Sequence, residues 1–172
     1  MSPLPVVVRP LARDELARVE RHIDQDFGNR DKHRLRLALQ EEGPAVYLVA
    51  WLSGLPVGHA LVRWAGAGVE PMSSQLPDCP DLEDLFVVPG LRSAGVGSRL
   101  LEAAERLARD RGCRRIGMSV DVASVRARGL YERRGYEDAG LGTFVLRSSW
   151  VDRDGAPREW AETCAYLVKN LP

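Results

Sequence analysis

The stretch from residue 82 to residue 120 constrains the fold of this chain more than any other part of its sequence. The stretch Leu82–Val88 is typical of a strand, and it ends at Pro89, which cannot donate to a strand ladder. A glycine-rich loop follows, and Val96–Arg111 then shows the apolar spacing of an amphipathic helix. Because a further strand is expected at Ile116–Val120, the sequence predicts an α/β fold.

The flanking regions supply further elements. Upstream, the patterns predict a strand at Val6–Val8, helices from Asp14 and from Asn29 to Gly43, and a hairpin of Val46–Trp51 with Pro56–Trp64. Residues 65–80 are rich in Gly, Pro and Ser and are expected to form a loop. Downstream, we expect a helix from Ser124 to Gly135 and strands at Thr143–Arg147 and Trp160–Lys169. The sequence therefore predicts one domain over residues 1–172, with a mixed central sheet of about six to seven strands flanked by about four helices.

Charge and cysteine content argue against several classes of function. Lys+Arg and Asp+Glu number 24 each, so the formal net charge is zero, and we expect no binding to nucleic acid or to a membrane. The three cysteines, Cys79, Cys113 and Cys164, form no CxxC pair, and the histidines are too dispersed to suggest a ligand pair. No metal site is therefore predicted.

Two further features bear on location in the cell. Apolar runs all fall short of the ~18 residues that a membrane-spanning helix needs. Residues 1–5 lack the basic start and apolar run of a signal peptide. We therefore expect the protein to be cytoplasmic.

The loop before the helix at Val96 is suited to binding an anion. A helix N-terminus leaves N–H groups unpaired and carries the positive end of the helix dipole, so it attracts phosphate. Gly95 and Gly97 have no Cβ and let the backbone approach such a group, while Arg92 can add a charged contact.

Other interpretations of this loop exist. The glycines are also compatible with an ordinary turn between a strand and a helix. A dinucleotide-binding GxGxxG pattern would need a glycine where the chain has Leu100, and a Walker loop would need a lysine after the glycines.

A family resemblance favours the anion site. Arg92-Ser93-Ala94-Gly95-Val96-Gly97 resembles the R/Q-x-x-G-x-G/A signature of the GNAT N-acetyltransferase family, whose loop holds the pyrophosphate of coenzyme A. The resemblance implies acetyl-CoA as cosubstrate. It implies pyrophosphate contacts for Arg92, Ser93, Gly95, Val96, Gly97 and Ser98, and backbone pairing of Leu85 and Val87 with the pantetheine arm.

A second signature follows at the expected place. Residues 124–136, SVRARGLYERRGY, resemble the family pattern N-x-x-A-x-x-L-Y-x-x-x-G-F. The chain departs from it with Ser124 in place of Asn and Tyr136 in place of Phe. The family's Asn contacts coenzyme A, and the shorter Ser124 leaves that contact open. The order and spacing of the two patterns agree with the family, and the hairpin and helices upstream suit the same fold, so the resemblance covers roughly residues 5–147.

The same resemblance assigns catalytic roles. It implies direct attack of an amine on acetyl-CoA, with Tyr131 as the general acid that protonates the leaving sulfur. The alternative is a core tyrosine that completes an apolar helix stripe. For the general base we favour Glu83 and then Asp81, because alternation along a strand puts both on the face of Leu85 and turns Asp84 away. These carboxylates are also compatible with a solvated strand entry.

The acceptor and the assembly are less constrained. The acceptor is expected to be a small-molecule or peptide amine, chosen by the variable segments 24–36 and 65–80. A non-catalytic coenzyme A-binding or sensor module on the same fold is the alternative function. A homodimer is expected through the apolar segment Ala161–Val168, because almost no chain follows this segment that could cover it.

Overall fold

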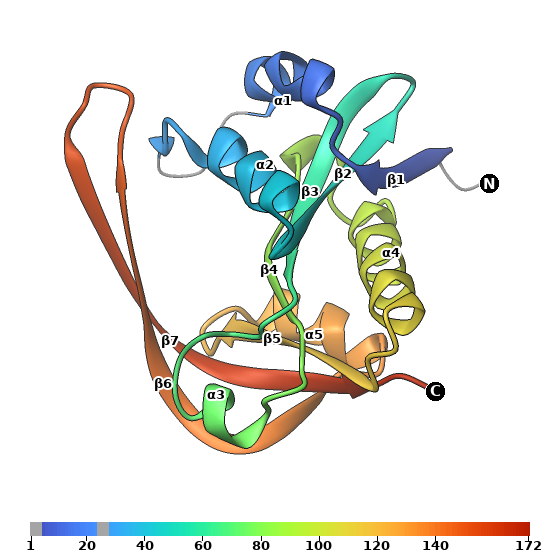
Figure 1. The fold of residues 1–172 in the computed structure, drawn as a ribbon, viewed down its shortest axis with the longest axis vertical. Helices are drawn as coiled ribbons and strands as arrows, with labels where there is room; N and C mark the ends of the chain where they lie inside the picture. Colours follow the sequence, from blue (N-terminus) through green and yellow to red (C-terminus); the bar gives the residue numbers. More distant parts are fainter. Residues whose placement is uncertain (1–4, 24–27) are drawn as a thin grey trace.

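The computed structural model describes residues 5–23 and 28–172, and the strands within them form one mixed sheet in the order β1-β2-β3-β4-β5-β7-β6 (Figure 1). The strands are β1 (Val6–Pro10), β2 (Ala45–Leu52), β3 (Leu55–Arg63), β4 (Asp81–Val87), β5 (Arg115–Asp121), β6 (Glu137–Val151) and β7 (Pro157–Asn170). The α-helices are α1 (Leu16–His22), α2 (Lys32–Glu42), α3 (Met72–Gln75), α4 (Val96–Asp110) and α5 (Val125–Arg133). The predicted α/β fold is confirmed, with seven strands and five α-helices in the described residues.

Helices cover both faces of the sheet. On one face α4 and α5 lie over a core in which Leu100 and Leu101 of α4 are fully buried (Figure 1). On the other face, Val19 of α1 and Leu37 of α2 pack with Tyr47 in a second core. Because both faces are covered, β2 and β3 are buried along nearly their whole length and read as continuous apolar runs.

Local signals in the sequence explain where several elements end. Gly43 follows α2 in the left-handed conformation, with φ +106°, which places a glycine where helices commonly stop. Ser53 and Gly54 both have positive φ in the tight turn between β2 and β3. These turn residues fix the hairpin that was predicted from the sequence.

The C-terminal hairpin is longer than predicted. The sequence pattern gave strands of 143–147 and 160–169, but β6 and β7 continue to a turn that the Asp152 carboxylate closes by accepting the N–H groups of Asp154 (3.0 Å) and Ala156 (2.9 Å). The tip reaches the start of α2, where the N–H of Arg30 donates to the Val151 carbonyl at 3.1 Å (Figure 1). Polar residues on exposed strands hid this extension from an apolar pattern.

Two further expectations need correction. Residues 65–80 are not all loop, since they contain the short helix α3. The segment Ala161–Val168 does not lack cover: β7 lies between β5 and β6, and Cys164, Tyr166 and Leu167 are buried within the chain. This segment therefore gives no reason to expect a dimer.

Candidate active site

The candidate site opens where β4 and β5 separate. These parallel strands pair at Asp81 and Gly117, and the N–H of Gly117 also donates to the Pro80 carbonyl at 3.0 Å. Tyr166 of β7 fills the space beside Gly117, where an added Cβ would lie 2.4 Å from its ring. Past this point, the edge of β4 towards β5 has no strand partner in the described residues.

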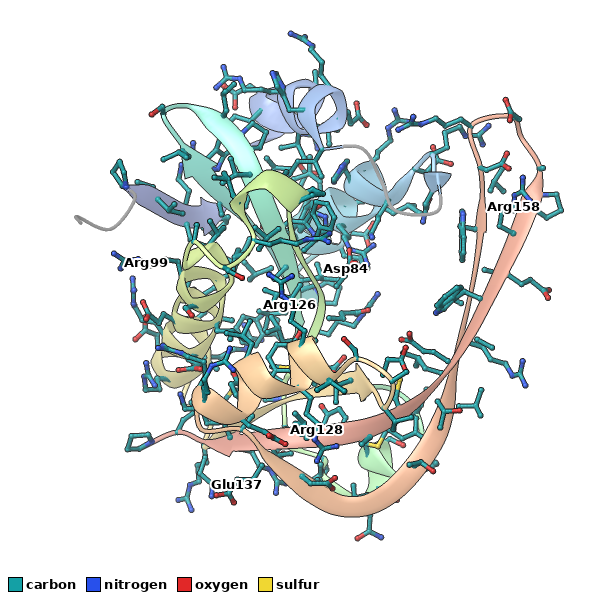
Figure 2. All side chains as sticks on the ribbon, turned by 180° about the vertical axis from the view of Figure 1, so that it is seen from behind. Asp84, Arg99, Arg126, Arg128, Glu137 and Arg158 are labelled. Carbon is teal, nitrogen blue, oxygen red and sulfur yellow. The ribbon has the colours of Figure 1, made fainter. Side chains whose placement is uncertain are left out.

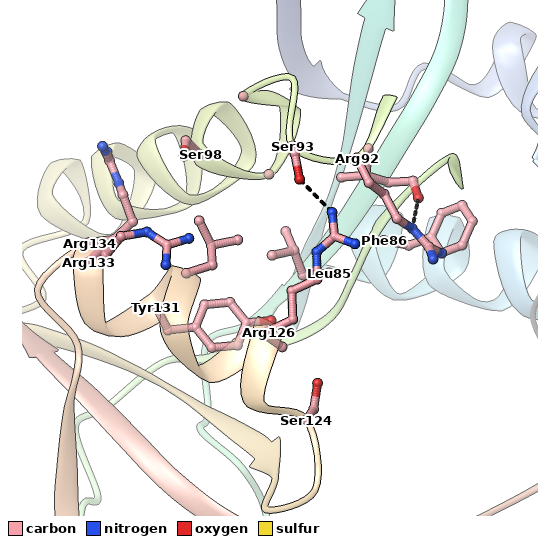
Figure 3. A pocket seen from close by; sticks show the side chains of 15 residues that line it. Leu85, Phe86, Arg92, Ser93, Ser98, Ser124, Arg126, Tyr131, Arg133 and Arg134 are labelled. Carbon is pink, nitrogen blue, oxygen red and sulfur yellow. Dashed lines mark hydrogen bonds between the residues drawn. The ribbon is translucent and has the colours of Figure 1, made fainter. Parts of the chain in front are cut away.

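A pocket of about 560 Å³ occupies the gap between β4, the start of α4 and α5 (Figure 3). Its lining includes the predicted residues Leu85, Val87, Arg92, Ser93, Gly95, Gly97, Ser98, Ser124 and Tyr131. The predicted residues Val96, Glu83 and Asp81 do not line it. Two segments far apart in the sequence thus meet around one cavity.

The loop that enters α4 has the backbone that an anion site needs. Ser93 and Gly95 both adopt positive φ, +66° and +88°, and Gly95 is the residue at the N-terminal cap of α4. A Cβ on Gly97 would lie 3.3 Å from Leu130 of α5, so glycine keeps the two helices close at the pocket. Val96, by contrast, turns its side chain into the core and is 1% exposed.

Arginines on α5 and directly after it add charge that was not predicted from the sequence. Arg126, Arg133 and Arg134 line the pocket, and the Arg126 guanidinium donates to the Ser93 hydroxyl at 2.5 Å across it (Figure 3). Residues three and four positions apart share a helix face, so their spacing from Leu130 was the available signal. Phe86 of β4 is a further lining residue that was not predicted.

Tyr131 is both a core residue and a pocket residue. Its side chain is 9% exposed, and its ring centroid lies 6.3 Å from that of Tyr136 in the core beneath α4. Burial raises the pKa of Tyr131 to about 12, so the hydroxyl is protonated at neutral pH. The two interpretations of this residue are therefore compatible.

A bulge in β4 corrects the predicted alternation of its side chains. The register with β3 shifts between Leu61 and His59, and Asp84 takes a positive φ of +57°. As a result Leu85 packs with Leu82 in the core beneath α4, not on a shared face with Asp81 and Glu83. Asp84 turns towards α2.

The two candidate bases differ in environment. Asp81 is 6% exposed and accepts a hydrogen bond from the Tyr166 hydroxyl at 2.8 Å, and burial raises its pKa to about 7. Glu83 is half-buried and pairs with the guanidinium of Arg63. Asp81 therefore has the proton affinity of a base that works near neutral pH, while Glu83 is held by a cation.

Comparison with known proteins bears on the site. The model of the Acetyltransferase (GNAT) family matches residues 14–136. A curated acetyltransferase of Agrobacterium fabrum is 30% identical over 130 residues, which cover 74% of this chain and 78% of that protein. An uncharacterized N-acetyltransferase of Bacillus subtilis is 44% identical over 66 residues, but the match spans 44% of that protein and 38% of this chain.

Solved structures show the same fold. An N-acetyltransferase from Staphylococcus aureus Mu50 superposes with a TM-score of 0.68 at 15% identity, covering 97% of this chain and 99% of that chain. The PaiA N-acetyltransferase of Thermoplasma acidophilum, solved in complex with coenzyme A, gives a TM-score of 0.64 at 12% identity and covers 99% of both chains.

Proposed function

The chain belongs to the Acetyltransferase (GNAT) family, and we propose that it moves the acetyl group of acetyl-CoA to a primary amine by direct attack. Membership makes it an acyltransferase; the cosubstrate, the residues and the acceptor are the proposal. The observation that carries the proposal is the pocket between β4 and α5, with the glycine-rich start of α4 at one end and Tyr131 in its wall.

The residues of the pocket fit a coenzyme A pyrophosphate. The N–H groups at the start of α4, together with Ser93 and Ser98, supply neutral donors for phosphate oxygens. Arg92 and Arg126 add charge at the rim, the first held by a 3.0 Å bond from its Nε to the Val87 carbonyl. Ser124 stands where the family has Asn, and its hydroxyl makes no helix-capping bond in α5, so it is free to face a ligand.

The strand edge fits the pantetheine arm. Past Asp81, the edge of β4 towards β5 has no strand partner among the described residues, although N–H and C=O groups of a strand require partners. Leu85 and Val87 lie on this stretch of β4. Arg92 already donates to the Val87 carbonyl, so the N–H groups of both residues and the Leu85 carbonyl are the groups that would pair with an extended chain of amides in the gap.

Two side chains divide the proton transfers. Bound acetyl-CoA supplies the activated acetyl group. Tyr131, protonated because burial raises its pKa to about 12, donates to the sulfur as negative charge develops there. A carboxylate accepts the proton from the amine: Asp81, whose pKa near 7 suits the task, or Glu83, each through water because neither lines the pocket.

An amine panel tests this proposal. The purified protein is mixed with acetyl-CoA and single amines, and release of the coenzyme A thiol is followed. We expect turnover with at least one amine that depends on Tyr131. Coenzyme A binding by calorimetry without turnover on any amine would instead identify a non-catalytic coenzyme A-binding module.

Further properties complete the proposal. We propose that residues 1–172 form one domain and that the protein is cytoplasmic. Two parts of the sequence used above lie outside the described residues: residues 1–4, which bear on the absence of a signal peptide pattern, and residues 24–27 of the predicted acceptor segment. No helix within the described residues is long and apolar enough to cross a membrane. A homodimer is now motivated by exposed apolar side chains on the β6–β7 hairpin, Val145 (54%) and Val151 (39%), and light scattering would distinguish it from a 19.0 kDa monomer.

A further inference from the structure

A cluster of charges lies on the α2 side of β4, opposite the coenzyme pocket. Its members, Lys32, Arg36, His59 and Asp84, are here called the α2-side cluster. Lys32 Nζ lies 2.7 Å from the Asp84 carboxylate, Arg36 Nη2 lies 3.3 Å from it, and His59 Nδ1 lies 3.6 Å from it. Lys32 and Arg36 are one helical turn apart on α2, so both reach the same carboxylate.

The positive charges of this cluster exceed its negative charges by one. Burial lowers the pKa of His59 to about 3, so at neutral pH it is uncharged. Burial is also the largest influence on Asp84 and opposes its ionisation, but the pKa of that carboxyl still lies below its usual value, and the charged neighbours Arg36 and Lys32 contribute to this lowering. Two cations therefore face one carboxylate. Beside the cluster, Arg63 pairs with Glu83 and lies opposite Asp81 on the neighbouring strand, a carboxyl that burial keeps mostly protonated below pH 7.

One donor of the cluster lacks an acceptor. The Nε atom of Arg36 is buried and has no hydrogen-bond partner in the described part of the chain. A buried donor left unpaired costs free energy, on the order of 1–3 kcal/mol and more for a charged group. Apart from the ion pairs given above, Asp84 Oδ2 and His59 Nδ1 of the same cluster are also buried without a hydrogen-bond partner among the described residues, so it is the excess of positive charge that favours one more oxyanion at this place.

The α2-side cluster adjoins the coenzyme pocket through Phe86. Asp84 immediately precedes Leu85 and Phe86, which line the pocket, and the Phe86 ring stacks on His59 with centroids 5.3 Å apart. In Figure 2 Asp84 lies between α2 and α5. The side chains of Lys32, Arg36 and Asp84 are 12%, 16% and 25% exposed, so only their outer atoms are accessible to a second substrate while the coenzyme occupies the other side of β4.

We propose that the acceptor is an amine that also carries an oxyanion, a carboxylate or a phosphate, which binds Lys32 and Arg36. This inference rests on the proposed acetyl transfer. An excess positive charge beside the acceptor also favours the neutral form of its amine, which is the form that attacks. The same charge repels a second ammonium group, so polyamines are poor acceptors.

A matched series of small amines tests the inference. Propylamine, β-alanine, 2-aminoethylphosphonate and 1,3-diaminopropane place a methyl, carboxylate, phosphonate or ammonium group at similar distance from the amine, and butylamine with 4-aminobutyrate repeats the comparison at a longer spacing. We expect kcat/KM for an oxyanion-bearing amine to exceed that of its alkyl match by about tenfold or more, and the diamine to be slowest. The carboxylate and phosphonate arms show which oxyanion is preferred.

A pair of variants on one helix locates the effect. Arg36→Gln removes the guanidinium from the α2-side cluster, and Arg34→Gln removes one from the exposed side of α2, where it lies 3.5 Å from Glu20. We expect Arg36→Gln to bring the ratio of β-alanine to propylamine near one through KM, with coenzyme A affinity unchanged. The Arg34→Gln protein should keep the wild-type ratio.

The outcomes are distinguishable. Equal or faster turnover of alkylamines and diamines by the wild type overturns the inference and leaves acetyl transfer intact, even if Arg36→Gln does not fold. A preference for oxyanions that survives Arg36→Gln also overturns it. Coenzyme A binding with no turnover on any amine removes the proposed function, and the acceptor inference with it.

Discussion

The two sides of β4 are built by different means. On the coenzyme side, the pocket is lined by β4, the backbone at the start of α4 and one face of α5. Its lining residues in the described part of the chain include neither carboxylates nor histidines. On the α2 side, charges and neutral histidines are buried together, and His33 donates from Nε2 to the Ile23 carbonyl at 3.1 Å while accepting from the Tyr47 hydroxyl at 2.6 Å. The first side suits an anionic ligand held by backbone donors and arginines, and the second, where a carboxylate is buried between two cations, suits selection of the acceptor by charge.

This contrast assigns different consequences to substitutions. Changes on the coenzyme side should alter coenzyme affinity or the chemical step for every acceptor. Changes on the α2 side should alter which acceptor is used, or the pH at which the amine is deprotonated.

Removal of the Tyr131 hydroxyl should have the largest effect. Tyr131→Phe keeps the buried ring and deletes the proposed acid, so we expect kcat to fall by ~10²–10⁴-fold with coenzyme A affinity and melting temperature nearly unchanged. Steady-state kinetics on any active amine, beside a thermal melt, measures this.

Tyr136→Phe is the matched control. Its hydroxyl donates to the buried Glu105 carboxylate at 3.1 Å in the core, so its loss should lower the melting temperature with kcat within about threefold of wild type. The same pattern in Tyr131→Phe would remove Tyr131 from the mechanism.

A carboxylate at Gly97 should abolish coenzyme binding without affecting the α2 side. Gly97→Asp adds negative charge where the pyrophosphate is proposed, and its Cβ meets Leu130 at 3.3 Å, so we expect coenzyme A affinity to fall by about 100-fold or more. Calorimetry measures the affinity. Gly90→Asp, in open space outside the pocket lining, adds the same charge and should bind nearly as wild type. Unchanged affinity in Gly97→Asp would place the coenzyme elsewhere.

The pH dependence of the rate should identify the base. If Asp81 accepts the proton, kcat/KM rises about tenfold from pH 6 to pH 8, because its pKa of about 7 makes ionisation pass through that range. Asp81→Asn should lose this step and most of the rate, while Glu83→Gln should keep the step. The reverse result would make Glu83 the base.

Stability gives a second reading of Asp81. Its folded pKa lies above the unfolded value of 3.8, so the folded state binds the proton more tightly. The stabilisation is complete below that value and is lost as pH rises through about 7. Thermal melts should show this loss in wild type and a smaller one in Asp81→Asn; an identical pH dependence in both would mean that Asp81 titrates normally.

The coenzyme side was largely predictable from sequence, and the α2 side was not. Segments 85–98 and 124–134 each carry a local motif, and the resemblance of these two motifs to the family patterns implied most of the predicted residues that line the pocket. Arg126 was not predicted as a pocket residue, because its position there depends on its contact with Ser93, which is distant in the sequence. The α2-side cluster joins Lys32, His59 and Asp84 from three elements, and no local pattern links them.

The bulge shows why strand alternation failed at one position. Regular alternation assumes one residue for each step of the ladder, and β4 holds an extra residue opposite β3. Aspartate tolerates the left-handed backbone better than most residues, so Asp84 is a suitable place for the extra residue. Most aspartates in strands do not mark a bulge, so the presence of Asp84 in this pattern was no reason to expect one.

The smallest predicted effect concerns the one departure from the family pattern inside the pocket. Ser124 lines the pocket at the start of α5, and its side chain makes no capping bond, so replacing it removes no contact of that kind. Asparagine caps helices as well as serine does, and its amide reaches further. If the pocket holds coenzyme A as proposed, Ser124→Asn gains one hydrogen bond, and affinity should improve about three- to fivefold, as expected for a net contribution of about 1 kcal/mol.

Calorimetry with coenzyme A measures the change, and Ser149→Asn on β6, outside the pocket, controls for the substitution itself. Acceptor preference should stay as in wild type, because the α2 side is untouched. Unchanged or weaker affinity would mean that the ligand does not pass this end of α5, and the contrast between the two sides of β4 would then rest on the loop at Gly95 and Gly97 alone.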